Sequence, residues 1–135
     1  MSIEESSLEA SSSSRSSSKD QALELAQLLE DGKADDVTVI EVTKLTSCAD
    51  FFVIATIHSS AHWQGLAKQI KDYVKANDMQ IHLTHTKTAG GDDWNVIDIG
   101  SVLVHLMSAD ARNFYELEKL WHAGNFIKGS QSENA

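Results

Sequence analysis

The chain has 135 residues, of which 41% are hydrophobic, and its 11 Lys and Arg against 20 Asp and Glu give a formal charge of -9. This length predicts one domain with one ordinary hydrophobic core. The acidic balance argues against nonspecific nucleic-acid binding, which depends on clustered positive charge, and is compatible with a basic protein partner.

The first 19 residues are rich in serine and poor in apolar side chains, a composition typical of a disordered tail. Organellar transit peptides can be Ser-rich, but they are poor in acids, whereas Glu4, Glu5 and Glu9 lie here. We therefore interpret residues 1–19 as a bacterial extension. The domain is expected over residues 20–127, followed by a flexible C-terminus at 128–135.

The first half of the domain predicts a helix, two strands and a second helix. Asp20 is a plausible N-cap, and helical apolar spacing continues to Gly32. A β-branched run at 37–42 and an almost continuous apolar run at 51–57 favour strands, the second covered on both faces. After Ser59-Ser60, either of which could cap, an apolar stripe predicts a long helix ending near Asn77.

The second half predicts a short strand, a hairpin and a closing helix. Residues 79–83 favour a strand, and 89–92 favour a turn. Two apolar strands flank Gly100-Ser101, which is typical of a two-residue hairpin loop. Because side chains alternate along a strand, one hairpin face is aliphatic, whereas the other mixes apolar residues with one acid and one imidazole. The six residues of this mixed face are Trp94, Val96, Asp98, Leu103, His105 and Met107.

The closing helix should begin after Ser108, which can act as its N-cap. Its apolar stripe, expected to pack back onto the sheet, consists of Phe114, Leu117, Leu120 and Trp121. Together the elements predict an α/β (α+β) fold, with a mixed sheet of about five strands flanked by helices.

Enzymatic sites are weakly supported. His58 and His62 could share a helix face, but no HExxH pattern accompanies them, and exposed or capping histidines are the better interpretation. Asp92 and Asp93 follow two glycines, and this composition is common in turns, so we interpret them as turn residues and not as metal ligands. Phosphate-binding GxxxxGK[ST] and GxGxxG loops are missing, so no nucleotide cofactor is predicted.

Cys48 is the single cysteine, which excludes an intrachain disulfide and a zinc ribbon. We expect it to be a small, partly buried residue in a reducing compartment. The sequence also lacks an apolar run of roughly 20 residues and a secretory signal, so a cytoplasmic location is expected.

Two blocks of this chain resemble the ribosomal silencing factor (Iojap-like) family. The closing block comprises DW at 93–94, IDIG at 97–100, VHLM at 104–107 and RNFYELEKLW at 112–121. The upstream block is ADFFVIAT at 49–56, which leads through a small-residue loop into a long helix. The resemblance covers roughly residues 20 to 122.

The resemblance implies a nucleotidyltransferase-like fold that lacks the catalytic site. It also implies a protein that catalyses no reaction and binds neither a metal nor a cofactor. Family members bind the large ribosomal subunit through ribosomal protein L14, hinder joining of the small subunit and lower translation when nutrients are scarce. Carried over by position, the contact surface comprises Trp94, Asp98, Leu103, His105 and Met107. The alternatives are a homodimeric adaptor that uses the same hairpin face, possible also for the free silencing factor, and more distantly a degenerate nucleotidyltransferase.

The chain departs from the family's pattern at three places. Ile57 replaces a common Gly, Thr84 to Thr88 replace a Val-Glu-Gly segment, and Ser101 replaces an acid after the hairpin Gly. These changes affect the expected details of partner contact more than the fold.

Overall fold

A computed structural model describes residues 18–86 and 93–129. The Ser-rich stretch at 1–17, the expected turn at 89–92 and residues 130–135 lie outside the described residues, as do Lys87 and Thr88 of the altered loop.

Within the described residues the sheet has six strands, in the order β3-β4-β5-β2-β1-β6. The central pair, β2 and β5, is parallel, and the other neighbouring strands are antiparallel, so the predicted mixed sheet is confirmed. The strands are β1 (Asp35–Glu41), β2 (Phe51–Ile57), β3 (Leu83–Thr86), β4 (Trp94–Asp98), β5 (Val102–Ser108) and β6 (Asn125–Lys128). The sixth strand, β6, contains Lys128, where a flexible end was expected.

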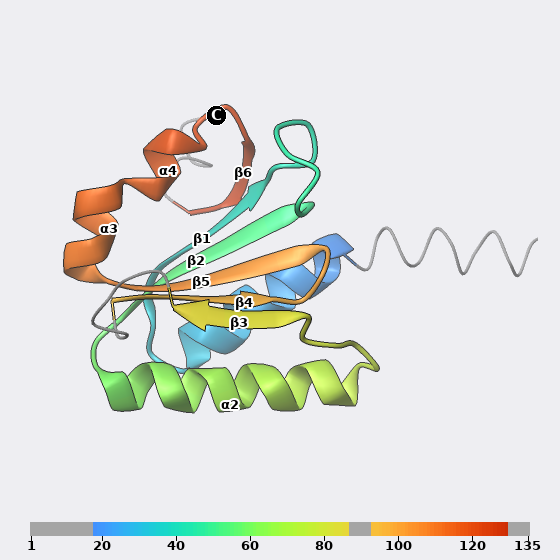
Figure 1. Ribbon diagram of the computed structural model, residues 1–135, viewed down its shortest axis with the longest axis vertical. Helices are drawn as coiled ribbons and strands as arrows, with labels where there is room; N and C mark the ends of the chain where they lie inside the picture. Colours follow the sequence, from blue (N-terminus) through green and yellow to red (C-terminus); the bar gives the residue numbers. More distant parts are fainter. Residues whose placement is uncertain (1–17, 87–92, 130–135) are drawn as a thin grey trace, which may run out of the picture.

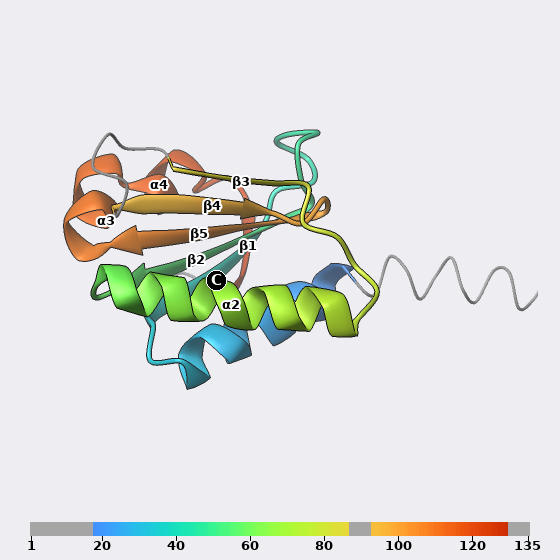
Figure 2. The ribbon, with the colours of Figure 1, turned by 60° about the horizontal axis from the view of Figure 1, so that its bottom comes forward.

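The helices cover the two faces of this sheet unequally (Figures 1 and 2). The N-terminal helix, described from residue 18 to residue 31, and α2 (Ser60–Ala76) pack on one face and bury the larger core. The short helices α3 (Ala109–Tyr115) and α4 (Leu117–Leu120) contribute to a smaller core on the other face. Every residue of β2 is buried, because this strand has a strand on each side and helices on both faces.

Local signals predicted α2 well. The Ser59 hydroxyl accepts a hydrogen bond from the His62 backbone N–H at 3.0 Å, and Asn77 ends the helix. The expected N-cap of the first helix is wrong, since Asp20 lies inside it. None of the helices in the described part of the chain has both the length and the apolar character that crossing a bilayer requires.

The predicted strand at 79–83 is displaced, since β3 starts only at Leu83. Residues after α2 first close that helix: Asp78 adopts a left-handed conformation with φ of 56°, and the Met79 N–H bonds to the Val74 carbonyl at 2.8 Å. Such a reversal satisfies carbonyls at the helix end and delays the strand.

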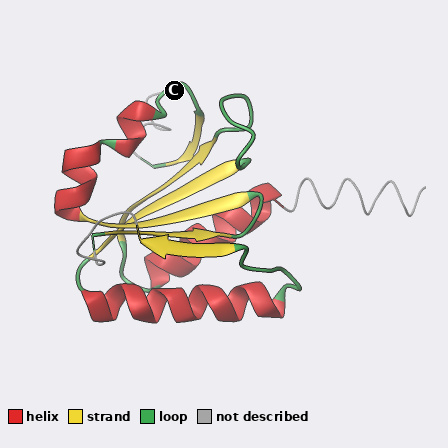
Figure 3. Ribbon diagram, in the orientation of Figure 1, coloured by secondary structure: helices red, strands yellow, loops and turns green. Residues whose placement is uncertain are grey.

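The closing helix is broken at Glu116, which has left-handed φ and ψ of 46° and 53°. Figure 3 shows the two helices, α3 and α4, into which it is divided. Ser108 caps α3 as predicted, and Leu117 is buried. The continuous apolar stripe is wrong, however, because Phe114 is 79% and Leu120 is 72% exposed. The break separates Phe114, on α3, from Leu117, on α4, whereas Leu120 lies on α4 and is exposed there.

Candidate docking surface

The β4–β5 hairpin has the register that the predicted two-residue loop at Gly100-Ser101 requires. Asn95 lies opposite Leu106 and Ile97 lies opposite Val104. Gly100 adopts a φ of 96°, which glycine tolerates better than other residues. The Asp98 carboxylate accepts a hydrogen bond from the Gly100 N–H at 2.8 Å and so stabilises the loop.

The mixed face of the hairpin forms mainly a second buried layer. Met107 is completely buried and His105 is 5% exposed, both beneath side chains of the smaller core. Trp94, Asp98 and Leu103 are half-buried. The structure therefore places three of the five carried-over residues at the margin of this face and covers the other two.

Trp94 is held from below and from the side. Its indole Nε1 donates to His105 Nδ1 at 3.1 Å, which fixes one edge of the ring. The Tyr115 ring lies 4.7 Å from the Trp94 ring between centroids, and the Phe114 ring lies 4.9 Å from that of Tyr115. We call Trp94, Phe114 and Tyr115 the aromatic surface. It joins the start of β4 to the end of α3.

Sequence reasoning missed Phe114 and Tyr115 as members of this surface because it assumed an unbroken helix. The adjacent aromatic pair was a usable signal, since neighbouring residues of a helix point in different directions and cannot share one buried stripe. Trp121 was expected to be a core residue, and it packs on Phe52 with ring centroids 4.8 Å apart.

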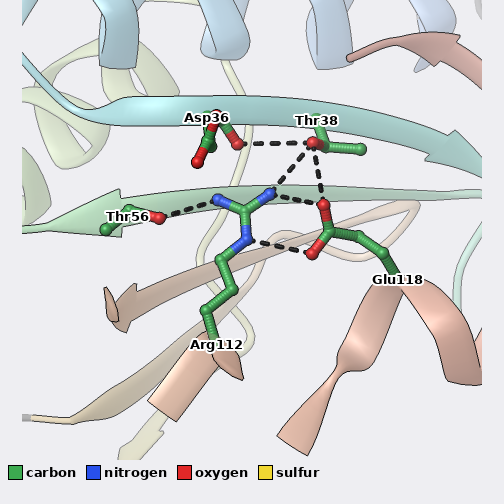
Figure 4. Close-up of polar contacts among 5 residues, drawn as sticks. All are labelled: Asp36, Thr38, Thr56, Arg112 and Glu118. Atoms are coloured by element: carbon green, nitrogen blue, oxygen red, sulfur yellow. Dashed lines mark hydrogen bonds and ion pairs between the residues drawn. The ribbon is translucent and has the colours of Figure 1, made fainter. Parts of the chain in front are cut away.

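A polar groove of about 1210 Å³ lies where β1, β2, α3 and α4 meet. Its most buried charge is Arg112, which is 8% exposed. Figure 4 shows the polar contacts of its guanidinium. Arg112 donates from Nη1 to Thr56 at 2.9 Å and from Nη2 to Thr38 at 3.0 Å. It also donates from Nε and Nη2 to the two carboxylate oxygens of Glu118, at 3.0 and 2.8 Å. The guanidinium is thus engaged by three side chains of the protein itself.

His58 and His62 do not form a two-histidine helix face, because His58 precedes α2. Their rings stack with centroids 5.2 Å apart, and His62 Nδ1 accepts a hydrogen bond from the His58 N–H at 3.0 Å. His62 Nε2 lies 2.8 Å from the Gly32 carbonyl, so His62 links the first turn of α2 to the turn that follows the N-terminal helix. Across residues 18–86 and 93–129, His, Cys, Asp and Glu side chains form no group of three that could hold a metal ion.

Cys48 is exposed, and the prediction of partial burial is wrong. It lies in the loop between β1 and β2, which extends beyond the sheet (Figure 1). Its backbone N–H bonds to the Thr46 hydroxyl at 3.1 Å, so the local turn holds the residue away from either core.

Comparison with known proteins identifies the family. The family described as "ribosomal silencing factor during starvation" matches residues 15–135. The chain belongs to the ribosomal silencing factor family. Its aromatic surface therefore lies within two segments, at β4 and α3, that first indicated this family.

Named relatives support this membership. A ribosomal silencing factor of Treponema pallidum is 39% identical over 99 residues, which cover 72% of this chain and 86% of the relative. That of Bacillus subtilis is 34% identical, covering 71% and 80%. The mouse protein named mitochondrial assembly of ribosomal large subunit protein 1 is 33% identical, covering 76% of this chain and 45% of its own length.

Solved structures support the fold of this silencing factor family member. A crystal structure of a Chromobacterium violaceum protein has 30% sequence identity and a TM-score of 0.67, and the match covers 76% of this chain and 85% of that protein. The family name denotes a regulatory role, and the names of these relatives indicate no catalytic activity.

Proposed function

We propose that this protein binds the large ribosomal subunit through ribosomal protein L14 and prevents the small subunit from joining. Family membership supports a role on the ribosome, and the name of the mouse relative refers to the large subunit. The aromatic surface carries the proposal at the level of residues. The expected setting is the cytoplasm of a bacterium.

The chemistry of the aromatic surface supports protein docking. Tyr and Trp are enriched at the buried centres of protein interfaces, because one end of the ring is apolar and the other can form a hydrogen bond. Phe114 is 79% exposed and Tyr115 is 41% exposed, although both are large aromatic residues. A partner that covers the three rings would remove this apolar area from water.

The five carried-over residues take different parts in this proposal. Trp94 is the anchor, and Leu103 lies on the same hairpin face and widens the apolar area. His105 and Met107 act from beneath, since His105 bonds the indole and Met107 fills the core below. Asp98 shapes the hairpin loop through its bond to Gly100.

The mechanism is steric and requires no reaction. A domain bound to the face where the subunits meet occupies volume that the small subunit needs, so affinity and position are sufficient. A catalytic alternative would need a substrate site, and the buried cation of the polar groove is already engaged by Thr38, Thr56 and Glu118.

A light-scattering assay of the association of the two ribosomal subunits tests this function. Addition of the protein to separated large subunits before small subunits should lower the amplitude of association. The Trp94→Ala variant should restore the amplitude. An unchanged amplitude with saturating wild-type protein would contradict the proposal. Sedimentation of the free protein would then test the alternative, a homodimeric adaptor. A dimer that forms through the hairpin face would favour it.

A further inference from the structure

We propose that the buried Arg112–Glu118 ion pair is a positioning device that holds the α3–α4 break and thereby presents the aromatic surface. The inference rests on the proposed docking function for its effect on binding. Its conformational part concerns this chain alone.

The pair spans the break and ties it to the sheet. Arg112 is in the last turn of α3, and Glu118 is in the first turn of α4. The same guanidinium bonds Thr38 of β1 and Thr56 of β2 (Figure 4). Glu118 also lies within hydrogen-bond distance of the Thr38 hydroxyl, at 3.4 Å. Both helices are therefore fixed to the two neighbouring strands by one network.

An unbroken helix could not contain this pair. Residues 112 and 118 are six positions apart, which in a continuous helix separates them by about 120° around the axis and about 9 Å along it. Side chains meet on a helix when they are three or four positions apart. The two parallel bonds from Arg112 to Glu118 consequently require the left-handed residue at Glu116, and the break and the ion pair form together.

The same sequence is also compatible with an alternative conformation, in which α3 and α4 form one continuous helix. Phe114, Leu117 and Trp121 are spaced by three and four residues and would share one face of a continuous helix. Packing that face on the sheet would turn the Phe114 ring inward and move Tyr115 away from Trp94. In the broken form Leu117 is buried while Phe114 is exposed. The ion pair thus selects the conformation in which the three aromatic rings form one surface.

Burial of a charged pair fits a role in specifying conformation. Removing Arg and Glu from water costs free energy that their attraction often only balances, so a buried pair is weak evidence for added stability, and in some proteins such pairs select one structure. Arg112 is 8% exposed, and the Glu118 side chain is 25% exposed. The planar guanidinium is also suited to hold two carboxylate oxygens and two hydroxyls at once, which an ammonium group is not.

The test separates position from stability by means of a rescue variant. Arg112→Met removes the pair and keeps a similar apolar stem. The double variant Arg112→Met with Glu116→Gly still lacks the ion pair, but it places at the break a glycine, which adopts the left-handed conformation with little strain. Lys119→Met is the matched control, since Lys119 forms an exposed ion pair with Glu116 at 3.9 Å. Glu118→Gln is a milder variant that serves if Arg112→Met does not fold.

Two quantities are measured on each variant. The fluorine NMR signal of Trp94 in 5-fluorotryptophan-labelled protein, assigned with Trp94→Phe, senses the Tyr115 ring, and Tyr115→Leu gives the reference shift for its loss. Affinity for purified large subunits gives the effect on docking. We expect Arg112→Met to move the Trp94 signal toward that of Tyr115→Leu and to weaken binding about tenfold, as displacement of an interface anchor does. Adding Glu116→Gly should reverse most of both changes, and Lys119→Met should cause neither.

An unchanged Trp94 signal in folded Arg112→Met would overturn the proposal. Unchanged affinity, in a variant whose Trp94 signal has moved, would overturn the link between the ion pair and docking. If wild-type protein does not bind large subunits while the signal moves and is rescued, the positioning role is supported and the proposed function fails.

Discussion

Trp94 is the residue on which the proposed function depends most, and its position follows from its neighbours. The indole N–H bonds His105 Nδ1 at 3.1 Å, so the imidazole must keep that nitrogen unprotonated. The Tyr115 ring supports its side at 4.7 Å. A ring fixed in this way loses little conformational entropy when a partner covers it.

A double-mutant cycle should detect the Trp94–His105 bond in the free protein. His105→Phe removes the acceptor and retains a ring against Phe52, whereas Trp94→Phe removes the donor. Each is expected to reduce the free energy of unfolding, and the coupling between them should be about 1 kcal/mol. Chemical denaturation of the four proteins gives this value. Strict additivity would mean that the bond contributes nothing to stability.

Tyr73 links α2 to the N-terminal helix, because its hydroxyl donates to the Glu24 carboxylate at 2.5 Å. Burial, followed by the hydrogen bond and charge of Glu24, raises the pKa of Tyr73 above its usual value. A group whose pKa is raised in the folded state stabilises the protein at pH below the unfolded pKa, here about 10, and this contribution is lost as the pH rises further.

Tyr73→Phe should therefore lower the free energy of unfolding by about 1 kcal/mol at pH 7, a modest value because the pair is close to solvent. The difference from wild type should shrink between about pH 10 and pH 11.5, since ionisation of the free tyrosine favours only the wild-type unfolded chain. Urea unfolding across this range measures the difference. A constant difference would show that the hydroxyl does not titrate with folding.

The sequence predicted which residues share the hairpin face, but it did not predict how exposed each of them is. Alternation placed His105 and Met107 on the same hairpin face as Trp94, which the structure confirms through the β4–β5 register. Alternation cannot say how far a helix from later in the chain covers that face. Ala111 of α3 and Leu117 of α4 belong to the same buried cluster as Met107, which is completely buried.

At the scale of elements, features set by neighbouring residues were predictable. The Ser59 cap, the end of α2 at Asn77 and the Gly100-Ser101 loop all depend on contacts within a few residues. Two other features depend on distant partners. The strand β6 exists because β1 offers it an edge, and the break at Glu116 is tied to hydrogen bonds from Arg112 to Thr38 and Thr56. Local sequence carries no signal for these partners.

The turn from α4 into β6 requires a residue without a side chain. A Cβ on Gly124 would lie 2.5 Å from Ile40 Cγ2 and 2.9 Å from the Glu41 carbonyl oxygen. Gly124→Ala should lower the free energy of unfolding by about 1–3 kcal/mol, because β6 or β1 must shift. Gly65→Ala on α2 is the control, since nothing lies within 4 Å of its added Cβ. It should stabilise the protein by up to about 1 kcal/mol, and thermal unfolding of both variants distinguishes the two effects.

At the scale of the whole molecule, the two faces of the sheet have different tasks. The N-terminal helix and α2 bury their face in the larger core. Among the described residues, the other face carries the short helices α3 and α4 (Figure 1). The aromatic surface lies where the end of α3 meets the start of β4. A rigid scaffold with one incompletely covered face is suited to docking, because little has to be ordered when the partner binds.

The net charge of -9 should affect the rate of docking more than its strength. If the partner surface is a basic ribosomal protein, the association rate with large subunits should fall as the salt concentration rises, because screening removes the long-range attraction. Stopped-flow measurements at several salt concentrations give this dependence. A rate that rises with salt would mean that repulsion by ribosomal RNA dominates the approach.

Co-sedimentation with separated ribosomal subunits tests the central claim most directly. Wild-type protein, Trp94→Ala and Trp63→Ala are compared at moderate salt. Trp63 is a matched tryptophan, since it is partly buried on α2 against the opposite core. We predict that wild type and folded Trp63→Ala sediment with the large subunit alone, and that folded Trp94→Ala sediments with neither subunit. Retention of Trp94→Ala on the large subunit at wild-type level would contradict the proposed surface, and absence of wild-type protein from both subunits would contradict the ribosomal function itself.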